Sequence, residues 1–111
     1  MYHIKTMNKI SPVGISRFDR ERYIVSAAEE NEDAILVRSA KLHDYAFPRN
    51  LLAIARAGSG VNNIPLDRCS QAGIAVFSTP GADANAVKEL VICSMLLGAR
   101  DIEGSSRWVK E

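Results

Sequence analysis

The stretch Leu51–Val61, LLAIARAGSGV, decides the fold class of this chain, because an apolar run leads through Arg56 into Gly58-Ser59-Gly60. An apolar run bounded by glycines is typical of a central strand in a parallel sheet, covered on both faces. Where such a strand ends at two glycines, successive backbone N–H groups can face an anion, and Arg56 adds positive charge beside them. The stretch therefore indicates a buried strand with an anion site at its carboxyl end.

Similar short apolar runs occur before and after this strand, separated by turn and helix signals. The alternation predicts an α/β domain with a mostly parallel, five-stranded sheet and crossover connections. The expected strands are Tyr2–Met7, Tyr23–Ser26, Ala34–Val37, Leu51–Ala57 and Ile74–Phe77.

The connections between these strands carry helix signals of different strength. Only a short helical piece fits between the first two strands. A short helix is expected over Lys41–Phe47, ended by Pro48, and another opens at Ile64–Asp67 and ends at Gly73. The acidic run Glu29–Asp33 is interpreted as a solvated loop.

The longest predicted helix covers Ala84–Arg100, with Asp83 or Asn85 as its cap. Apolar residues surround most of its axis, so it needs more cover than one small sheet offers. We interpret it as a packing surface for another domain or subunit, and expect a homodimer through this helix. Residues 1–100 are expected to form the domain, and residues 101–111 a connector whose end is disordered.

Bulk composition excludes several classes of function. The chain has 111 residues, a net charge of +1 and 47% hydrophobic residues, which favours one globular domain without nucleic-acid or membrane binding. The amino terminus lacks a signal-peptide core, so we expect a cytoplasmic protein. Cys69 and Cys93 are expected to be reduced, and His3 and His43 lie too far apart in sequence to predict a metal site.

Three stretches fall at the carboxyl edge of the predicted sheet, where open parallel sheets bind ligands. They are Arg38-Ser39, Arg56–Val61 and Ser78–Asp83. Backbone N–H groups would hold a carboxylate and guanidinium groups a phosphate, so the rim predicts a small, doubly anionic ligand. Two alternatives stay open: the arginines pair with acidic neighbours, or the glycines serve only a tight turn.

Nucleotide motifs are absent from these residues. A dinucleotide fingerprint would need glycine where Asn63 stands, and no lysine follows the glycines as in a triphosphate-binding loop. A receiver domain would need an aspartate where the third strand instead ends in Arg38-Ser39.

The chain resembles the D-isomer-specific 2-hydroxyacid dehydrogenases in three stretches of sequence, which are ILVRSA, AIARAGSGVNNIPLDRCSQAGIAVFSTPG and NAVKEL. The resemblance runs from about Tyr2 to Trp108 and covers about the first third of a family member. It implies a flavodoxin-like, doubly wound substrate domain, whose long apolar helix leads toward a Rossmann domain that carries NAD and is absent from these residues. The implied reaction oxidises 3-phospho-D-glycerate to 3-phosphohydroxypyruvate, the first step of serine biosynthesis.

The resemblance also implies which residues touch a substrate. Ser59, Gly60 and Val61 match the loop whose N–H groups bind the carboxylate, while Arg38, Ser39 and Arg56 lie toward the phosphate. Gly81 and Asp83 depart from residues common in relatives. The catalytic residues and the NAD site lie outside this sequence, so the chain alone is expected to be inactive. The rival interpretations are a non-enzymatic dimerisation module and a metabolite-sensing domain.

Overall fold

The computed structural model describes residues 1–111 in two compact units, Met1–Pro80 and Gly81–Glu111. Every strand belongs to the first unit. In chain order the elements are β1 (Tyr2–Thr6), α1 (Pro12–Ile15), β2 (Tyr23–Ser26), β3 (Ala34–Val37), β4 (Ala53–Arg56), α2 (Leu66–Ala72), β5 (Ala75–Phe77), α3 (Ala84–Ala99) and α4 (Ile102–Lys110).

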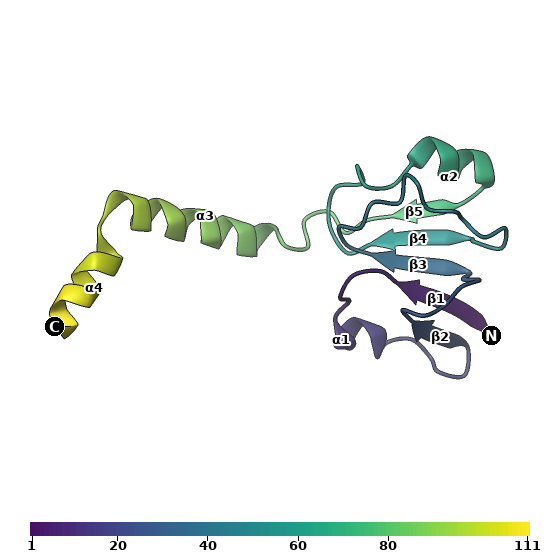
Figure 1. The fold of residues 1–111 in the computed structure, drawn as a ribbon, viewed down its shortest axis with the longest axis horizontal. Helices are drawn as coiled ribbons and strands as arrows, with labels where there is room; N and C mark the ends of the chain where they lie inside the picture. Colours follow the sequence, from purple (N-terminus) through teal and green to yellow (C-terminus); the bar gives the residue numbers. More distant parts are fainter. The chain divides into compact units, whose positions relative to one another are not determined.

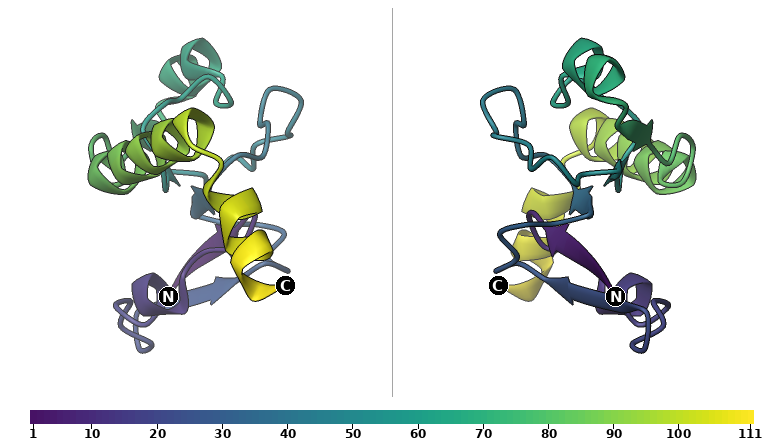
Figure 2. Two further views of the ribbon diagram at one scale, coloured as in Figure 1. Left: turned by 90° about the vertical axis from the view of Figure 1, so that its left-hand side faces the viewer. Right: turned by 90° about the vertical axis from the view of Figure 1, so that its right-hand side faces the viewer.

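The five strands form one sheet in the order β2-β1-β3-β4-β5, with every neighbouring pair parallel (Figure 1). This is the flavodoxin-type order, in which the direction of strand succession reverses between β1 and β3. The helix α1 lies at the β2 end of the sheet and α2 at the β5 end (Figure 1 and Figure 2). The α/β fold predicted from the sequence is confirmed, with β1, β4 and β5 shorter than expected.

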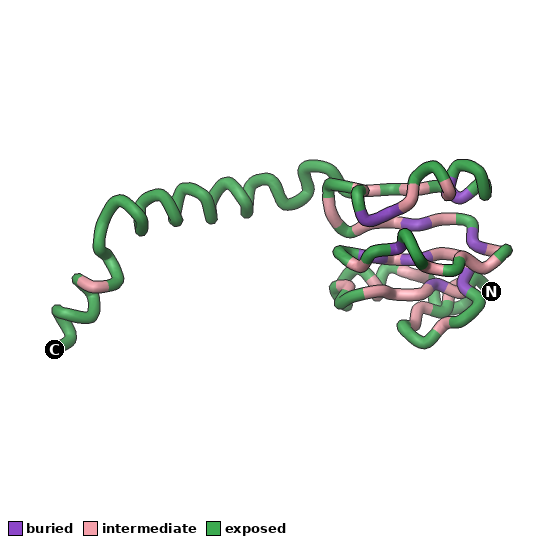
Figure 3. The backbone as a smooth tube through the Cα atoms, turned by 45° about the horizontal axis from the view of Figure 1, so that its top comes forward, coloured by how far each residue is buried: buried purple, intermediate pink, exposed green.

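One face of the sheet carries the core. The register pairs Ile35 with Ile54 and Ile54 with Val76, so these three side chains share a face. Ile35 and Ile54 are 0% exposed, as expected for adjacent β-branched residues in central strands. The buried positions all lie in the first unit (Figure 3), and the core cluster consists of Ile35, Val37, Leu42, Leu51, Ile54, Ile64, Cys69 and Ile74.

Helix α2 ends as the sequence predicts. Gly73 adopts a left-handed φ of 73°, and its backbone N–H bonds back to the carbonyls of the last turn. The chain then enters β5 after one residue, and Cys69 on α2 is buried in the core. Burial raises the pKa of the Cys69 thiol, so this cysteine stays protonated and behaves as a small apolar side chain.

The helix predicted over Lys41–Phe47 is wrong. This segment contains a turn, with Tyr45 N–H donating to Leu42 O at 3.2 Å, and no helix. Leu42 is buried, and Tyr45 and Phe47 pack against the core. The reason is tertiary: the carbonyls that a helix would use accept hydrogen bonds from Arg68 on α2.

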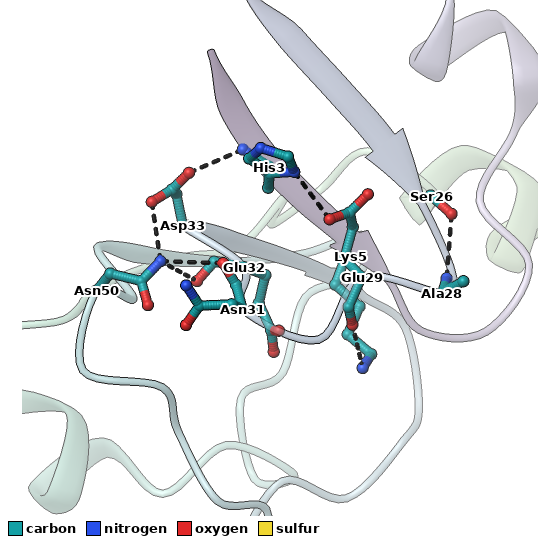
Figure 4. A network of polar contacts seen from close by, with 9 residues as sticks. All are labelled: His3, Lys5, Ser26, Ala28, Glu29, Asn31, Glu32, Asp33 and Asn50. Atoms are coloured by element: carbon teal, nitrogen blue, oxygen red, sulfur yellow. Dashed lines mark hydrogen bonds and ion pairs between the residues drawn. The ribbon is translucent and has the colours of Figure 1, made fainter.

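The acidic run Glu29–Asp33 is not the solvated loop expected from its composition. Glu32 is 0% exposed and accepts a hydrogen bond from Tyr45 Oη at 2.5 Å. Asp33 accepts from the backbone N–H of His3 at 2.8 Å and from Asn50 Nδ2 at 3.0 Å (Figure 4). These carboxylates satisfy donors of neighbouring segments, which a count of charges along the chain does not reveal.

Two pKa shifts follow from this network. The backbone N–H of His3, and after it the Asn50 amide, stabilise the charged carboxylate and lower the pKa of Asp33. Burial, and after it the hydrogen bond to Glu32, raises the pKa of Tyr45. Asp33 therefore stays charged and Tyr45 stays neutral over a wide pH range.

The second unit contains α3 and α4. Every residue of α3 is exposed, including large apolar side chains such as Leu90 and Met95. The tail is helical as far as Lys110, whereas we expected its end to be disordered: Asp101 caps α4 by accepting the Gly104 N–H at 3.0 Å. Capping outweighs the low helix propensity of Gly104 and the serines. None of the helices has the length and apolar character needed to cross a membrane.

Candidate functional site

A cavity opens at the carboxyl ends of β3 and β4. Its volume is about 460 Å³, and it is lined by Ser39, Lys41, His43, Arg56, Asn62 and Asn63. The position follows from the sheet register, which pairs Val37 with Arg56 at the last residue of each strand. Because Val37 is a core residue, Arg56 shares the core face, and the connection from Arg38 to Leu52 passes beside it.

Arg56 joins the cavity to the glycine turn. Its Nη1 donates to the carbonyl oxygen of Gly60 and lies 3.4 Å from Asn62 Oδ1, while its Nε is buried and makes no hydrogen bond. A Cβ on Gly58 would lie only 3.1 Å from that Nε, and neither Gly58 nor Gly60 has a positive φ. The glycines therefore give space to the guanidinium instead of supplying a left-handed turn.

The alternative in which the two arginines pair with acidic neighbours is wrong. The two ion pairs of the structure join His3 to Glu29 and Arg107 to Glu103. Arg38 is exposed and lies 3.4 Å from the carbonyl oxygen of Lys9 through its Nη1. The charges of Arg38 and Arg56 are thus left for a ligand or solvent.

The turn Ser59–Val61 lies beside the cavity but does not line it. Ser59 and Gly60 are exposed, Val61 packs against the core, and their three backbone N–H groups make no hydrogen bond within the chain. Thr79 N–H donates to Gly58 O at 2.9 Å and holds the turn against the end of β5. The turn therefore keeps free donors on an anchored backbone.

Two asparagines hold the backbone that follows β3. Asn8, with a left-handed φ of 68°, accepts through Oδ1 from the N–H groups of Arg38, Ser39 and Ala40 at 3.0 to 3.1 Å. Asn63 donates through Nδ2 to the carbonyls of Arg38 and Ala40 at 3.0 and 2.9 Å. Both faces of this turn are thereby bonded, and Ser39 is held at the cavity.

Of the six predicted site residues, Ser39 and Arg56 line the cavity, whereas Arg38, Ser59, Gly60 and Val61 do not. Lys41 and His43 also line it, and the sequence analysis missed them. On the helix expected there, residues two apart point to different sides. In the irregular backbone observed, both reach the cavity, and His43 Nε2 lies 2.8 Å from Asn62 O.

The lining determines what the cavity can do chemically. An ammonium, a guanidinium and an imidazole come together with a hydroxyl and two amides, and no carboxylate lines the space. Such a set binds phosphate or carboxylate oxygens. No group of three or more histidine, cysteine, aspartate or glutamate side chains is placed to hold a metal ion. The cationic and amide groups of the lining indicate an anion site.

Comparison with known proteins identifies a family and several relatives of this chain. The family model described as "D-isomer specific 2-hydroxyacid dehydrogenase, catalytic domain" matches residues 4–106. The hydroxypyruvate reductase of Thermotoga maritima is 44% identical over 71% of this chain and 27% of its own length. The D-3-phosphoglycerate dehydrogenase of Archaeoglobus fulgidus is 38% identical over 79% of this chain and 15% of its own length. The chain thus spans less than a third of the length of these relatives.

A solved structure is similar in fold. The NAD⁺-bound 3-phosphoglycerate dehydrogenase of Entamoeba histolytica superposes with a TM-score of 0.73 and 24% sequence identity, over 87% of this chain and 39% of that one.

Proposed function

Because this chain belongs to the family of D-isomer-specific 2-hydroxyacid dehydrogenases, we propose that residues 1–100 form the substrate-binding portion of a D-3-phosphoglycerate dehydrogenase. Residues 101–111 connect that portion to a nucleotide-binding domain. The substrate is a small anionic 2-hydroxy acid, 3-phospho-D-glycerate, and the full-length enzyme acts in the cytoplasm.

The observation that carries this proposal is the carboxylate-free cavity beside a turn with free N–H groups. The phosphate binds in the cavity through Lys41, His43 and Arg56. The substrate carboxylate binds to the N–H groups of Ser59, Gly60 and Val61. Arg56 contacts both places, so it sets their separation. Arg38 and Ser39 flank the phosphate end.

NAD is the cofactor of the full-length enzyme in this proposal, in keeping with the NAD⁺ of the Entamoeba histolytica structure. When bound to the full-length enzyme, NAD would supply the acceptor for the hydride of the substrate. The present residues do not fit a dinucleotide, because Asn63 stands where the fingerprint needs a third glycine, and its amide is bonded to Arg38 and Ala40. The chain by itself therefore holds only the substrate.

Amide chemical shifts measured during titration with 3-phosphoglycerate test the site. We expect millimolar affinity and shifts at Ser59–Val61 and His43. Lys41→Met removes a charge-assisted hydrogen bond and weakens binding about tenfold, whereas Lys110→Met in α4 serves as the control. Arg56→Ala should also weaken binding. Unchanged affinity in both cavity variants would refute the site.

Activity assays test whether the chain is inactive without a nucleotide-binding domain. The purified chain mixed with 3-phosphoglycerate and NAD should produce no NADH, because nothing in it orients the nicotinamide against the substrate. Steady turnover would contradict this part of the proposal.

Hydroxypyruvate is the second candidate substrate class, favoured by the 44% identity to the Thermotoga maritima reductase. The two candidates differ in the phosphate. If glycerate and hydroxypyruvate shift the amides of Ser59–Val61 as strongly as 3-phosphoglycerate does, the cavity is not a phosphate site and the reductase is preferred.

We also propose that α3 mediates a homodimer. All of its residues are exposed, and Leu90, Ile92 and Leu96 are at least half exposed. Analytical ultracentrifugation should show a dimer that Leu90→Glu converts to a monomer. A dimer without anion binding would instead favour the non-enzymatic module, and thermal shifts with other metabolites but not with 3-phosphoglycerate would favour the sensing domain.

A further inference from the structure

We propose that Arg68 is a positioning residue for the anion cavity. It holds the segment from Leu42 to Phe47 in the backbone shape that places His43 at the cavity. The inference rests on the proposed function for its ligand, but it concerns a side chain that does not itself line the cavity.

The contacts of Arg68 are directed at backbone. From α2, its Nη1 donates to His43 O at 2.8 Å, and its Nη2 donates to Leu42 O at 3.2 Å and to Tyr45 O at 2.5 Å. Its guanidinium also lies 4.1 Å from the centroid of the Phe47 ring. One planar group thus fastens four residues of a segment that has no secondary structure of its own.

Arg68 is not engaged in charge pairing. Neither ion pair of the structure includes it, and its Nε is buried without a hydrogen-bond partner. A half-buried guanidinium without a carboxylate is costly to place, so the carbonyls and the ring are its main compensation. The arrangement therefore ties the position of the charge to the shape of this one segment.

The rest of the connection is held by other means. Asn8 and Asn63 fasten Arg38–Ala40, and Leu42 N–H donates to Asn63 O at 2.8 Å. Beyond Leu42, the imidazole of His43 makes a hydrogen bond with the carbonyl of Asn62 at 2.8 Å. Without Arg68, the carbonyls of His43 and Tyr45 would lose their partner and Leu42 O would keep only the N–H of Tyr45, so the backbone of His43 would be less firmly held at the cavity.

Binding of 3-phosphoglycerate to four variants of the full chain tests the inference. Arg68→Met removes all donors, and we expect affinity about tenfold weaker. Arg68→Lys keeps the charge but not the planar fork, so we expect a loss of at least fivefold. Arg49→Met removes an exposed arginine from the same connection and should bind within twofold of the unchanged chain. Ile74→Val, a core change that lowers stability away from the cavity, should also bind within twofold.

Amide hydrogen exchange supplies a readout without ligand. In Arg68→Met, exchange should accelerate at least tenfold at Tyr45, whose N–H is bonded to Leu42 O, and remain unchanged in β3 and β4. Arg68 variants that bind within twofold and exchange normally would overturn the inference. So would an Arg68→Lys chain with full affinity, since charge alone would then suffice.

The two proposals fail separately. If the unchanged chain shows no shifts with 3-phosphoglycerate, the proposed function fails. The exchange data then test the positioning role of Arg68 by themselves. Local acceleration in Arg68→Met supports that role, and unchanged or uniformly faster exchange refutes it.

Discussion

The two compact units have a similar apolar content but differ in how far their apolar side chains are buried. In residues 1–80, apolar side chains from strands, loops and α2 interlock into a core in which Ile35 and Ile54 are fully buried. In residues 81–111 no residue is buried, although α3 is rich in leucine, valine and isoleucine. The difference teaches that hydrophobicity stabilises a fold only where a second layer covers it, because isolated helices of this length are marginal in water.

Core truncation should separate the two units most strongly. Ile54→Ala leaves a cavity between central strands and should lower the free energy of unfolding by about 2–5 kcal/mol. Leu90→Ala on α3 removes an exposed side chain, so the first unit should change by less than about 0.5 kcal/mol. Urea denaturation followed by far-ultraviolet circular dichroism measures both, and equal losses would contradict the placement of the core at Ile54 and not at Leu90.

A buried polar contact gives the next largest effect. Tyr45→Phe leaves the fully buried Glu32 without its partner and should cost about 1–3 kcal/mol. The paired change Tyr45→Phe with Glu32→Leu should recover part of this loss, because no unpartnered carboxylate remains. An unchanged free energy of unfolding in Tyr45→Phe alone would show that Glu32 reaches water.

Capping tests the second unit by itself. Asp101→Ala removes the side-chain oxygen that accepts the Gly104 N–H and should destabilise α4 by about 1 kcal/mol. Carbon chemical shifts of residues 102–110 report the loss of helix. Unchanged shifts in residues 102–110 would contradict the role of Asp101 as the cap of α4.

Acid titration gives the smallest effect. The lowered pKa of Asp33 means that its contribution to stability is present above pH 3.8 and is lost as the pH falls through the folded-state pKa. Asp33→Asn should flatten this part of the profile of unfolding free energy against pH. A profile with the same slope in the variant would assign the acid sensitivity to other groups.

Strand positions could be predicted because each depends on local pattern. Tyr23–Ser26 and Ala34–Val37 match the observed strands, and Gly73 ends α2 at the expected place. The connection after β3 could not be predicted in this way. Its backbone shape depends on Arg68 from a helix more than twenty residues later, and no periodicity within Lys41–Phe47 reports that contact.

The candidate site shows the same division. Arg56 and the glycine turn were visible because they adjoin one strand, whereas Lys41 and His43 required knowledge of the loop. The burial of Glu32 was missed for a related reason, because its half-buried partner Tyr45 lies on the next connection. Sequence proximity predicts a site only as far as one element extends.

The amino-acid sequence alone determined the class of fold, the approximate positions of the strands and the family, because hydrophobic period, turn residues and motif spacing are local properties of the chain. Only the tertiary structure decided which cations share a cavity, that Glu32 is buried and that Arg68 holds the loop. Those properties arise from contacts between distant segments, whose free energies depend on burial and geometry and leave no regular trace along the sequence.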